Sequence, residues 1–546
     1  MIKKLRIPLA VSILMILVFA AGCVNNAGVA VLSANDMVFA LADASNIEVH
    51  PFQLGDIELM NAGGQSISAP LDGIISIPST EGPHPVVVIF HGARRISSIR
   101  EHMYAGFDYL VRQLAAEGFA AISINVLVNY TFEMGEPLVH NEWAMDLFDG
   151  HISFLENANA GQDVGHGIYL TNKLDLSQIH LIGHSRGGEV ANCIVLRDIN
   201  NNIERIQSII RVGTTVIFEE GDIFHPDIPT GIIIPEFDGD VLSHDGHLVF
   251  DEILHLGQNQ SIASLVYLRG ANHNFFNRDV LVDDRVDSMN AAHLAVDTWL
   301  TREEQEDFLM RYAAAFLSVV TNASEPWGVF APSASQPNTM FGYAVTASTY
   351  IPGRLRVLAL PSEDAAHRYI TTTGPASAFY YEQAIPLYSA GLFNHPAALG
   401  RHNRRPMYAL EWEAGGGTVS FALGENDFTA HSSLALYVAV DSSNQLNPQG
   451  EYQSFTLVIT DSDGNNQGIT IPMGTSPLAF HPGYAWDAEW FDGETRQFWV
   501  GFMPFGELRI PLSYFYDINL SAVAKVGIVF DQTQSGAVML SGIYLK

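Results

Sequence analysis

The sequence has little of three things: cysteine, basic residues and long apolar stretches. Two cysteines in 546 residues are too few for a disulfide framework. Only 27 Lys and Arg oppose 59 Asp and Glu, which gives a net charge of −32. The basic surface that neutralises phosphates is therefore missing, and we expect no nucleic-acid partner. Beyond the first residues, no stretch is long and apolar enough to span a bilayer.

Length and composition point to more than one folded unit. A chain of 546 residues exceeds the usual size of a single domain. Hydrophobic residues make up 48% of the chain, which supplies large cores and excludes wholesale disorder. We therefore expect an acidic protein with two domains.

The chain begins with a short basic head, an apolar run and a small-residue exit, MIKKLRIPLAVSILMILVFAAGC. This layout is typical of a secretory signal peptide, here residues 1–22, although the apolar run also approaches the length of a membrane-spanning helix. The ending AAGC resembles a bacterial lipobox, with Ala20 in place of the more usual leucine, and predicts lipidation of Cys23. We therefore expect an exported lipoprotein, anchored to the membrane on the extracytoplasmic side, with residues 23–50 as a tether.

Residues 51–322 alternate between strand-like and helix-like stretches. The runs HPVVVIFHG and TGIIIPEF are continuously apolar, as in fully buried strands, whereas FDYLVRQLAAEGF has apolar residues at helical spacing. Strands that alternate with helices indicate a mostly parallel sheet with helices on both faces, which is the α/β class.

The pattern changes at about residue 322. Residues 323–345 are rich in Pro, Ser, Ala and Asn, which predicts a linker. Residues 346–546 hold short strand-like runs such as GTVSFAL, LALYVAV and KVGIVF, separated by Gly, Asp, Asn and Pro. This spacing is typical of an antiparallel sandwich, so we expect an all-β second domain.

A serine stands where an apolar strand gives way to a helix, in the stretch IHLIGHSRGGEVA. Gly183 and Gly187 flank it, and small residues there allow the tight turn that projects a hydroxyl from the carboxyl end of a sheet. The N-terminus of the following helix favours negative charge at this point. The pattern alone also arises by chance in loops, but its strand-turn-helix context predicts that Ser185 is a nucleophile.

A serine nucleophile needs a base and an acid that orients the base. With this turn the expected chain order is serine, acid, histidine, each just after a strand. His273 follows the run SLVYLRG and is the candidate base, one of 20 histidines in the chain. Asp238 and Asp240 follow TGIIIPEF, and we prefer Asp238 as the acid because it lies nearer the strand end. Asp240 would then cap a turn or face solvent, and solvated surface side chains are the alternative for all three residues.

Two backbone amides are candidates for stabilising an oxyanion beside this serine. His91 and Gly92 end the buried run VVVIF, which brings the N–H of Ala93 to the same edge of the sheet. The N–H of Arg186, directly after the serine, is the other donor. The Arg186 side chain has two candidate roles, a clamp on a substrate carboxylate or a bond to Glu189, and we favour the second.

The motifs HGA, GHSRGG, DGDV and GANHNFF resemble those of the α/β-hydrolase superfamily, over residues of about 55 to 320. They are similar to the exported branch with dienelactone hydrolases, platelet-activating-factor acetylhydrolases and cutinase-like enzymes. The resemblance implies no metal or organic cofactor. The segment VIFEEGDIFHPDIPT, where many relatives carry a lid, is short here. The roles implied are a catalytic triad of Ser185, Asp238 and His273, and an oxyanion hole at Ala93 and Arg186.

The end of the second domain resembles a galactose-binding-like jelly roll, which makes carbohydrate a candidate partner. Aromatic residues in WDAEWFDGETRQFWVGF are sugar-stacking candidates, but most aromatic residues of a sandwich lie in its core. The motif HDGH at residues 244–247 is a weak candidate for a metal site, because histidines in acidic loops are usually only solvated. We therefore assign no metal ligands.

The sequence thus predicts a lipid-anchored serine hydrolase with an α/β-hydrolase domain and a jelly-roll sandwich, acting on small-molecule or polymeric carboxylic esters. Two other functions fit the same motifs. One is a surface-anchored glycan-binding protein with an inactive hydrolase domain, and the other is an amidase or peptidase with the same triad. An intact triad favours an enzyme over a binding protein.

Overall fold

The computed structural model describes most of the chain beyond its first 29 residues. The expected signal peptide and Cys23 lie outside the described part. Within that part, no helix is long and apolar enough to cross a membrane. The described residues are 30–33, 36–60, 64, 66–94, 98–132, 141–216, 218–219, 222–223, 225–288, 298–381, 406–423, 427–489 and 495–546.

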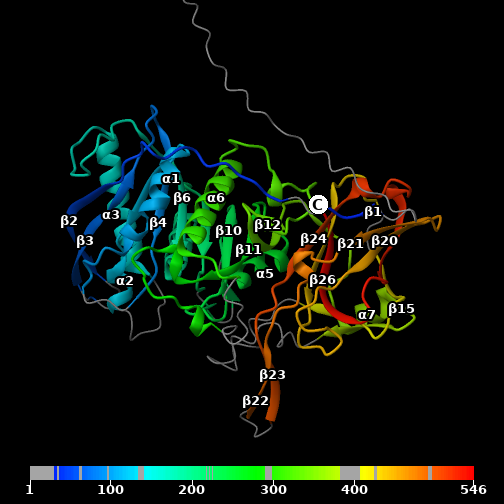
Figure 1. The fold of residues 1–546 in the computed structure, drawn as a ribbon. Helices are drawn as coiled ribbons and strands as arrows, with labels where there is room; N and C mark the ends of the chain where they lie inside the picture. The colour runs from blue at the N-terminus through cyan, green and yellow to red at the C-terminus, as the bar shows by residue number, and fades with distance from the viewer. Residues whose placement is uncertain are drawn as a thin grey trace, which may run out of the picture.

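A large mixed sheet forms the centre of the first domain (Figure 1). Its strand order is β12-β13-β11-β10-β7-β6-β4-β5-β3-β2. Neighbours from β5 to β11 are parallel, whereas β3 is antiparallel to both β5 and β2. The bounds are β2 His50–Met60, β3 Ser66–Ser76, β4 His84–Phe90, β5 Ala120–Ile124, β6 Leu174–His184, β7 Ile206–Val212, β10 Thr230–Phe237, β11 Ala263–Asn272, β12 Thr339–Met340 and β13 Tyr343–Tyr350.

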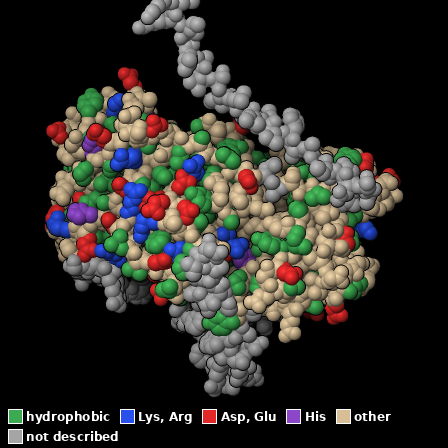
Figure 2. Space-filling view, in the orientation of Figure 1, with side chains coloured by type: hydrophobic (Ala, Val, Ile, Leu, Met, Phe, Trp, Pro, Cys, Tyr) green, Lys and Arg blue, Asp and Glu red, His purple; other side chains and the backbone are tan. Residues whose placement is uncertain are grey.

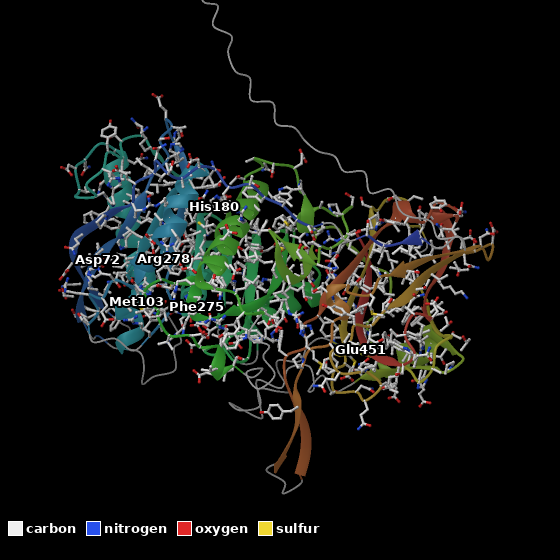
Figure 3. The ribbon with its side chains drawn as sticks, viewed as in Figure 1. Asp72, Met103, His180, Phe275, Arg278 and Glu451 are labelled. Carbon is white, nitrogen blue, oxygen red and sulfur yellow. The ribbon has the colours of Figure 1, made fainter. Side chains whose placement is uncertain are left out.

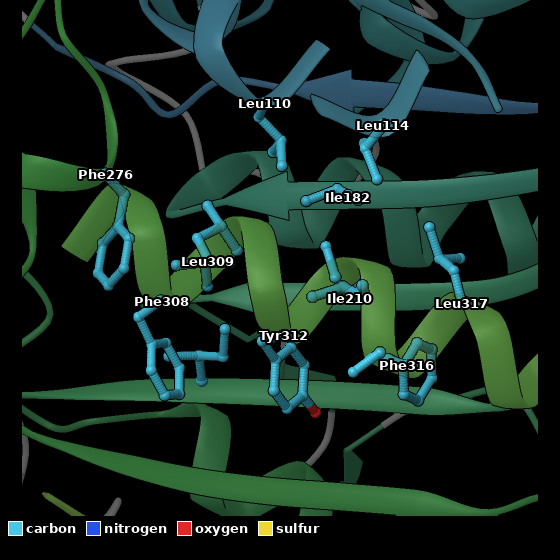
Figure 4. Packing of buried hydrophobic residues seen from close by; sticks show 14 of the residues in the cluster. Leu110, Leu114, Ile182, Ile210, Phe276, Phe308, Leu309, Tyr312, Phe316 and Leu317 are labelled. Atoms are coloured by element: carbon cyan, nitrogen blue, oxygen red, sulfur yellow. The ribbon is translucent and has the colours of Figure 1, made fainter. Parts of the chain in front are cut away.

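Helices cover both faces of this sheet because its central strands are apolar on both sides. In β4, Val87 and Ile89 face the core with α1 (Asp108–Ala116) and α6 (Arg302–Val320), which Figure 4 shows from close by. Val86 and Val88 face the opposite core. The helices that pack on that side are α3 (Glu142–Asn159) and α4 (Arg186–Asn200), and α5 (Gly246–Leu256) follows β10. The shorter α2 spans Leu127–Phe132.

Two pieces of chain cross the domain limits expected from composition. β13 runs through the end of the expected linker into the expected second domain, yet it pairs antiparallel with β11 at the edge of the large sheet. Its sequence YAVTASTY is rich in β-branched and aromatic residues, which suits a strand better than a linker. At the other end of the chain, β1 (Ala30–Val31), within the expected tether, pairs with β21 of the second domain.

The second domain consists mainly of two antiparallel sheets around one apolar core. One sheet has the order β1-β21-β20-β25-β18-β15, and the other β16-β17-β26-β19-β24. The expected fold class, a mostly parallel sheet followed by antiparallel sheets, is confirmed. The bounds are β14 Leu355–Arg356, α7 Glu363–Tyr369, β15 Ile370–Thr373, β16 Ala376–Tyr381, β17 Met407–Trp412, β18 Gly417–Ala422, β19 Ser433–Val440, β20 Phe455–Asp461, β21 Asn466–Ile471, β24 Gly506–Pro511, β25 Val523–Phe530 and β26 Gly536–Leu545.

Two further hairpins stand outside these sheets. The pair β22 (Tyr484–Glu489) and β23 (Thr495–Val500) projects from the body of the molecule, at the bottom of Figure 1. The short pair β8 (Phe218–Glu219) and β9 (Asp222–Ile223) falls in the segment VIFEEGDIFHPDIPT. Of the aromatic residues in the stretch WDAEWFDGETRQFWVGF, Phe502 is described and is buried. The side chains of the other sugar-stacking candidates lie outside the described residues.

The two domains share a buried interface. Apolar residues of α5, β10 and β11 pack in one cluster with residues of β17, β19 and β26. Within this interface the Glu507 carboxylate accepts hydrogen bonds from the backbone N–H of Thr349 (2.8 Å) and from Gln336 Nε2 (2.9 Å). Lys546 Nζ lies 2.7 Å from the other oxygen of Glu507. A charged group of the second domain therefore holds β13 of the large sheet.

Candidate active site

Ser185 occupies a strained turn between β6 and α4. Its φ of 55° and ψ of −129° lie outside the regions that non-glycine residues ordinarily adopt, as at many functional sites. Its backbone N–H bonds to the carbonyl of Val212 at 2.8 Å, and the residue is 3% exposed. Gly92 packs directly against it, since a Cβ on Gly92 would stand 2.6 Å from the Cβ of Ser185. The predicted strand-turn-helix context is thus present, with the serine at the carboxyl end of the strand.

His273 and Asp238 meet just beyond the ends of β11 and β10. His273 Nδ1 lies 2.9 Å from Asp238 Oδ2, and both side chains are buried. The other oxygen of Asp238 accepts hydrogen bonds from the backbone N–H groups of Asp240 (3.0 Å) and Val241 (2.6 Å). The carboxylate oxygen beside Nδ1 is a hydrogen-bond acceptor and so keeps the proton of the neutral imidazole on Nδ1. The structure therefore pairs His273 with the aspartate that the sequence favoured.

Asp240 reaches the opposite side of the same imidazole. The turn at Gly239 separates the two aspartates, and Asp240 Oδ2 lies 3.6 Å from His273 Nε2. The Asp240 side chain is 61% exposed, so it faces solvent as expected, but it also contacts the base. Burial disfavours the imidazolium, yet the carboxylates of Asp238, Asp240 and Asp284 outweigh this effect and raise the pKa of His273 to about 9.

The loop after β4 carries the first predicted oxyanion donor and is held by His91. The buried His91 ring accepts a hydrogen bond at Nε2 from the N–H of Val126 (3.1 Å), so its Nδ1 donates to the carbonyl of Gly92 (2.8 Å). Burial lowers the pKa of His91 to about 4, which keeps this arrangement of protons at neutral pH. The carbonyl of His91 also accepts from the hydroxyl of Tyr130 (2.9 Å). These bonds fix the loop on which Ala93 stands.

The Arg186 side chain turns toward its own helix. Its guanidinium lies 3.8 Å from the Glu189 carboxylate and 5.3 Å from the centre of the Tyr130 ring. This is the arrangement expected for the favoured role, in which Arg186 bonds Glu189. The residue that supplies the second predicted oxyanion amide is thereby anchored at the start of α4.

A cavity of about 820 Å³ joins these residues. Four of the five predicted hydrolase-site residues line it: Ser185, His273, Ala93 and Arg186. The fifth, Asp238, lies behind His273. Asp240 also lines the cavity. Met103, which also lines the cavity, and Phe275, two residues after His273, are labelled near the lower edge of the first domain in Figure 3. The remaining lining is largely apolar and includes Val241, Val280, Leu281 and Val282.

Sequence reasoning missed Asp284, which joins the two loops that carry Asp238 and His273. Its buried carboxylate accepts hydrogen bonds from three backbone N–H groups: Gly239 (2.7 Å), His273 (3.2 Å) and Asn274 (3.0 Å). Gly239 must lack a side chain, because the backbone of Asp284 occupies the space of a Cβ there. Asp284 follows no strand and belongs to no motif, so its only signal was the acidic pair at 283–284.

His184 was also missed, although it lies within the serine motif. Its Nε2 donates a hydrogen bond to the carbonyl of His273 (2.9 Å), and the two rings lie 4.7 Å apart. Burial lowers the pKa of His184 to about 3, so it is neutral. The residue before the nucleophile thus holds the backbone of the base.

The HDGH motif contributes to packing at the domain interface. His244 lies edge-on to Phe502, with ring centres 4.4 Å apart, and His247 lies 5.6 Å from the same ring. His247 Nδ1 donates to the carbonyl of His244 (2.8 Å). Across the described residues, no three His, Cys, Asp or Glu side chains gather as a metal ion requires.

No protein-family model and no curated protein matches this sequence. Among solved structures, an esterase from Pyrobaculum calidifontis is 16% identical with a TM-score of 0.32, over 52% of this chain and 87% of the esterase. EstE1, a thermostable carboxylesterase from a metagenomic library, is 14% identical with a TM-score of 0.31, over 52% of this chain and 92% of EstE1. An esterase from Rhizomucor miehei is 12% identical with a TM-score of 0.32, over 52% of this chain and 87% of that one.

The large sheet itself identifies the fold of the first domain. The order β2-β3-β5-β4-β6-β7-β10-β11, with β3 antiparallel and the serine turn after β6, is that of the α/β-hydrolase fold. The first domain has this fold, over about half of the chain.

We expect Asp284 to be a main support of this site. Asp284→Ala leaves three backbone N–H groups without their acceptor, one of them in the buried residue His273, and should lower the free energy of unfolding by about 3 kcal/mol. Urea unfolding measures this change. Asp287→Ala removes an exposed carboxylate from the same segment and should change stability by less than about 0.5 kcal/mol. Equal losses in the two variants would contradict the assigned role.

Proposed function

We propose that this protein is a serine hydrolase that cleaves carboxylic esters through an acyl-enzyme on Ser185. The observation that carries the proposal is that Ser185 and His273 line one cavity while Asp238 holds the far nitrogen of His273. A strained serine at a helix N-terminus, an imidazole that can accept its proton and a buried carboxylate are the parts that acyl transfer requires.

In the proposed reaction, His273 Nε2 takes the proton of the Ser185 hydroxyl as Oγ attacks the ester carbonyl carbon. The carbonyl oxygen becomes an oxyanion beside the N–H groups of Ala93 and Arg186. His273 then gives its proton to the departing alcohol, and the acyl group stays on Ser185. Water, deprotonated by the same imidazole, attacks the acyl-enzyme, and the acid leaves. Asp238 stabilises the imidazolium that forms in both steps.

We also propose that the protein is exported and held at the extracytoplasmic face of a membrane by lipid on Cys23. The support is the leader pattern ending in AAGC. Cys23→Ala should move the protein from the membrane fraction to the soluble fraction, or block its processing. Fractionation followed by mass spectrometry of the mature N-terminus measures this. Unchanged partitioning with the leader removed would contradict lipid anchoring.

The nucleophile is tested by substitution and by covalent labelling. Ser185→Ala should lose nearly all hydrolysis of short acyl esters while its thermal unfolding is unchanged, and a fluorophosphonate should label Ser185 in the unmodified protein. Amides and acetylated sugars in the same panel separate an esterase from an amidase or peptidase. Full activity of Ser185→Ala would contradict the proposal, and an inactive protein that fluorophosphonate leaves unlabelled would favour a binding role.

The two aspartates are distinguished by rate and by pH. Asp238→Asn should lower kcat by several orders of magnitude, since the same change in a serine protease triad costs about ten-thousandfold. Asp240→Asn should change kcat on a neutral ester by less than about threefold, because Asp240 is exposed and does not hold Nδ1. The neutral imidazole is the active form, so kcat/KM should rise with pH below about 9. Removing the Asp240 charge should move this rise to lower pH. A larger loss of kcat from Asp240→Asn would reverse the assignment.

A further inference from the structure

The cavity beside Ser185 has an acidic side that its basic residues do not balance. Asp240 lines the cavity next to the base, and Asp279 lines it beside Arg94. Two arginines, Arg94 and Arg186, also line it. Charge at this place acts on any substrate whose ester bond reaches Ser185, because the cavity walls are largely apolar and focus the field.

Both arginines are already engaged by acids that do not line the cavity. Arg94 Nη2 lies 3.1 Å from Glu101, and its Nη1 donates to the carbonyl of Asp279 at 2.8 Å. Arg186 lies 3.8 Å from Glu189, and its buried Nη2 has no hydrogen-bond partner among the described residues. The positive charge of each arginine is therefore compensated by an acid outside the cavity.

Asp240 differs from the two arginines, because the partner of its charge is the base itself. Among the described residues, its ion pair is with His273 Nε2, at 3.6 Å. His273 must be neutral to accept the serine proton, and in that state it no longer compensates the carboxylate. Among the residues that the structure describes, the other acidic groups near this ring are Asp238 and Asp284, while His184 and His244 are buried neutral rings. A reacting substrate thus meets a negative charge beside the base.

We propose that Asp240 is a specificity-determining residue that excludes anionic esters, so that the natural substrates are neutral or cationic esters with apolar acyl or alcohol parts. This inference rests on the proposed esterase function. The apolar side of the cavity fits it: Leu281 is 81% exposed and Val282 is 66% exposed at the cavity lining, where they offer contact to an apolar group. Carboxylate-bearing esters would place a second negative charge within several ångströms of Asp240.

The test compares matched esters that differ in charge. On the acyl side the pair is 4-nitrophenyl butyrate and 4-nitrophenyl hemisuccinate, and on the alcohol side it is 4-nitrophenyl acetate and 4-acetoxybenzoate. For each ester the ratio of kcat/KM between Asp240→Asn and the unmodified protein is taken, so that intrinsic reactivity cancels. We expect Asp240→Asn to raise kcat/KM about five- to tenfold on the anionic ester of at least one pair, relative to its neutral partner.

Three controls make the outcome specific to the charge of Asp240. Asp240→Glu keeps the charge and should keep the discrimination. Asp287→Asn removes the same charge at an exposed position that does not line the cavity, and should leave every ratio near one. The Asp240→Asn effect should shrink at high ionic strength, as expected for a partly exposed charge.

The result that overturns the proposal is an equal ratio for the anionic and neutral esters of both pairs, within about twofold. A loss of more than about a hundredfold by Asp240→Asn on all four esters would also overturn it, because Asp240 would then belong to the reacting groups. Failure of the proposed function is distinguishable, since it would appear as Ser185→Ala retaining hydrolysis of the neutral esters.

Discussion

The tight turn at Ser185 is the constraint on which the rest of the site depends. A non-glycine residue at φ 55° and ψ −129° persists only when its surroundings determine its conformation. Here β7 provides the Val212 carbonyl for the serine N–H, and the loop after β4 closes over the serine at Gly92. Because β4 and β7 flank β6 on either side, the same sheet order that builds the core also holds the turn.

The surroundings of His273 combine burial with three carboxylates, and each carboxylate has a different environment. Asp238 and Asp284 are buried, a costly position for a charge, and backbone N–H groups supply the hydrogen bonds that offset this cost. Asp240 is exposed to solvent, so its charge costs little desolvation free energy. The first two can therefore fix geometry, whereas Asp240 is the one whose charge a substrate meets. In Figure 2, acidic and basic side chains are interspersed on the visible face of this domain.

Much of the fold could be predicted from the sequence because buried parallel strands and amphipathic helices leave strong local patterns. The residues Ser185, Asp238 and His273 could be placed near one another because each directly follows an apolar run. Asp284 could not, since its role depends on where a loop after the last parallel strand folds back, and nothing local encodes that return. The position of Asp240 at Nε2 likewise depends on the turn at Gly239, which the sequence could suggest but not orient.

The sequence could not show that β13 belongs to the sheet of the first domain, for a related reason. An antiparallel strand near the end of that sheet has the same sequence pattern as the antiparallel strands of the second domain. Glu507 of the second domain binds β13 through a hydrogen bond. Burial alone would leave the carboxyl group of Glu507 protonated. Arg509 and Lys546 outweigh burial and lower the pKa of Glu507 to about 2, so the carboxylate is charged and can bind the Thr349 N–H of β13. Removing one of these three buried charged groups would leave the others without a partner. The free-energy cost of that loss exceeds the stability that the complete set contributes. The second domain is thus joined by β13 to the large sheet of the first. The partner strand of β13 is β11, and His273, the base of the proposed reaction, directly follows the last residue of β11.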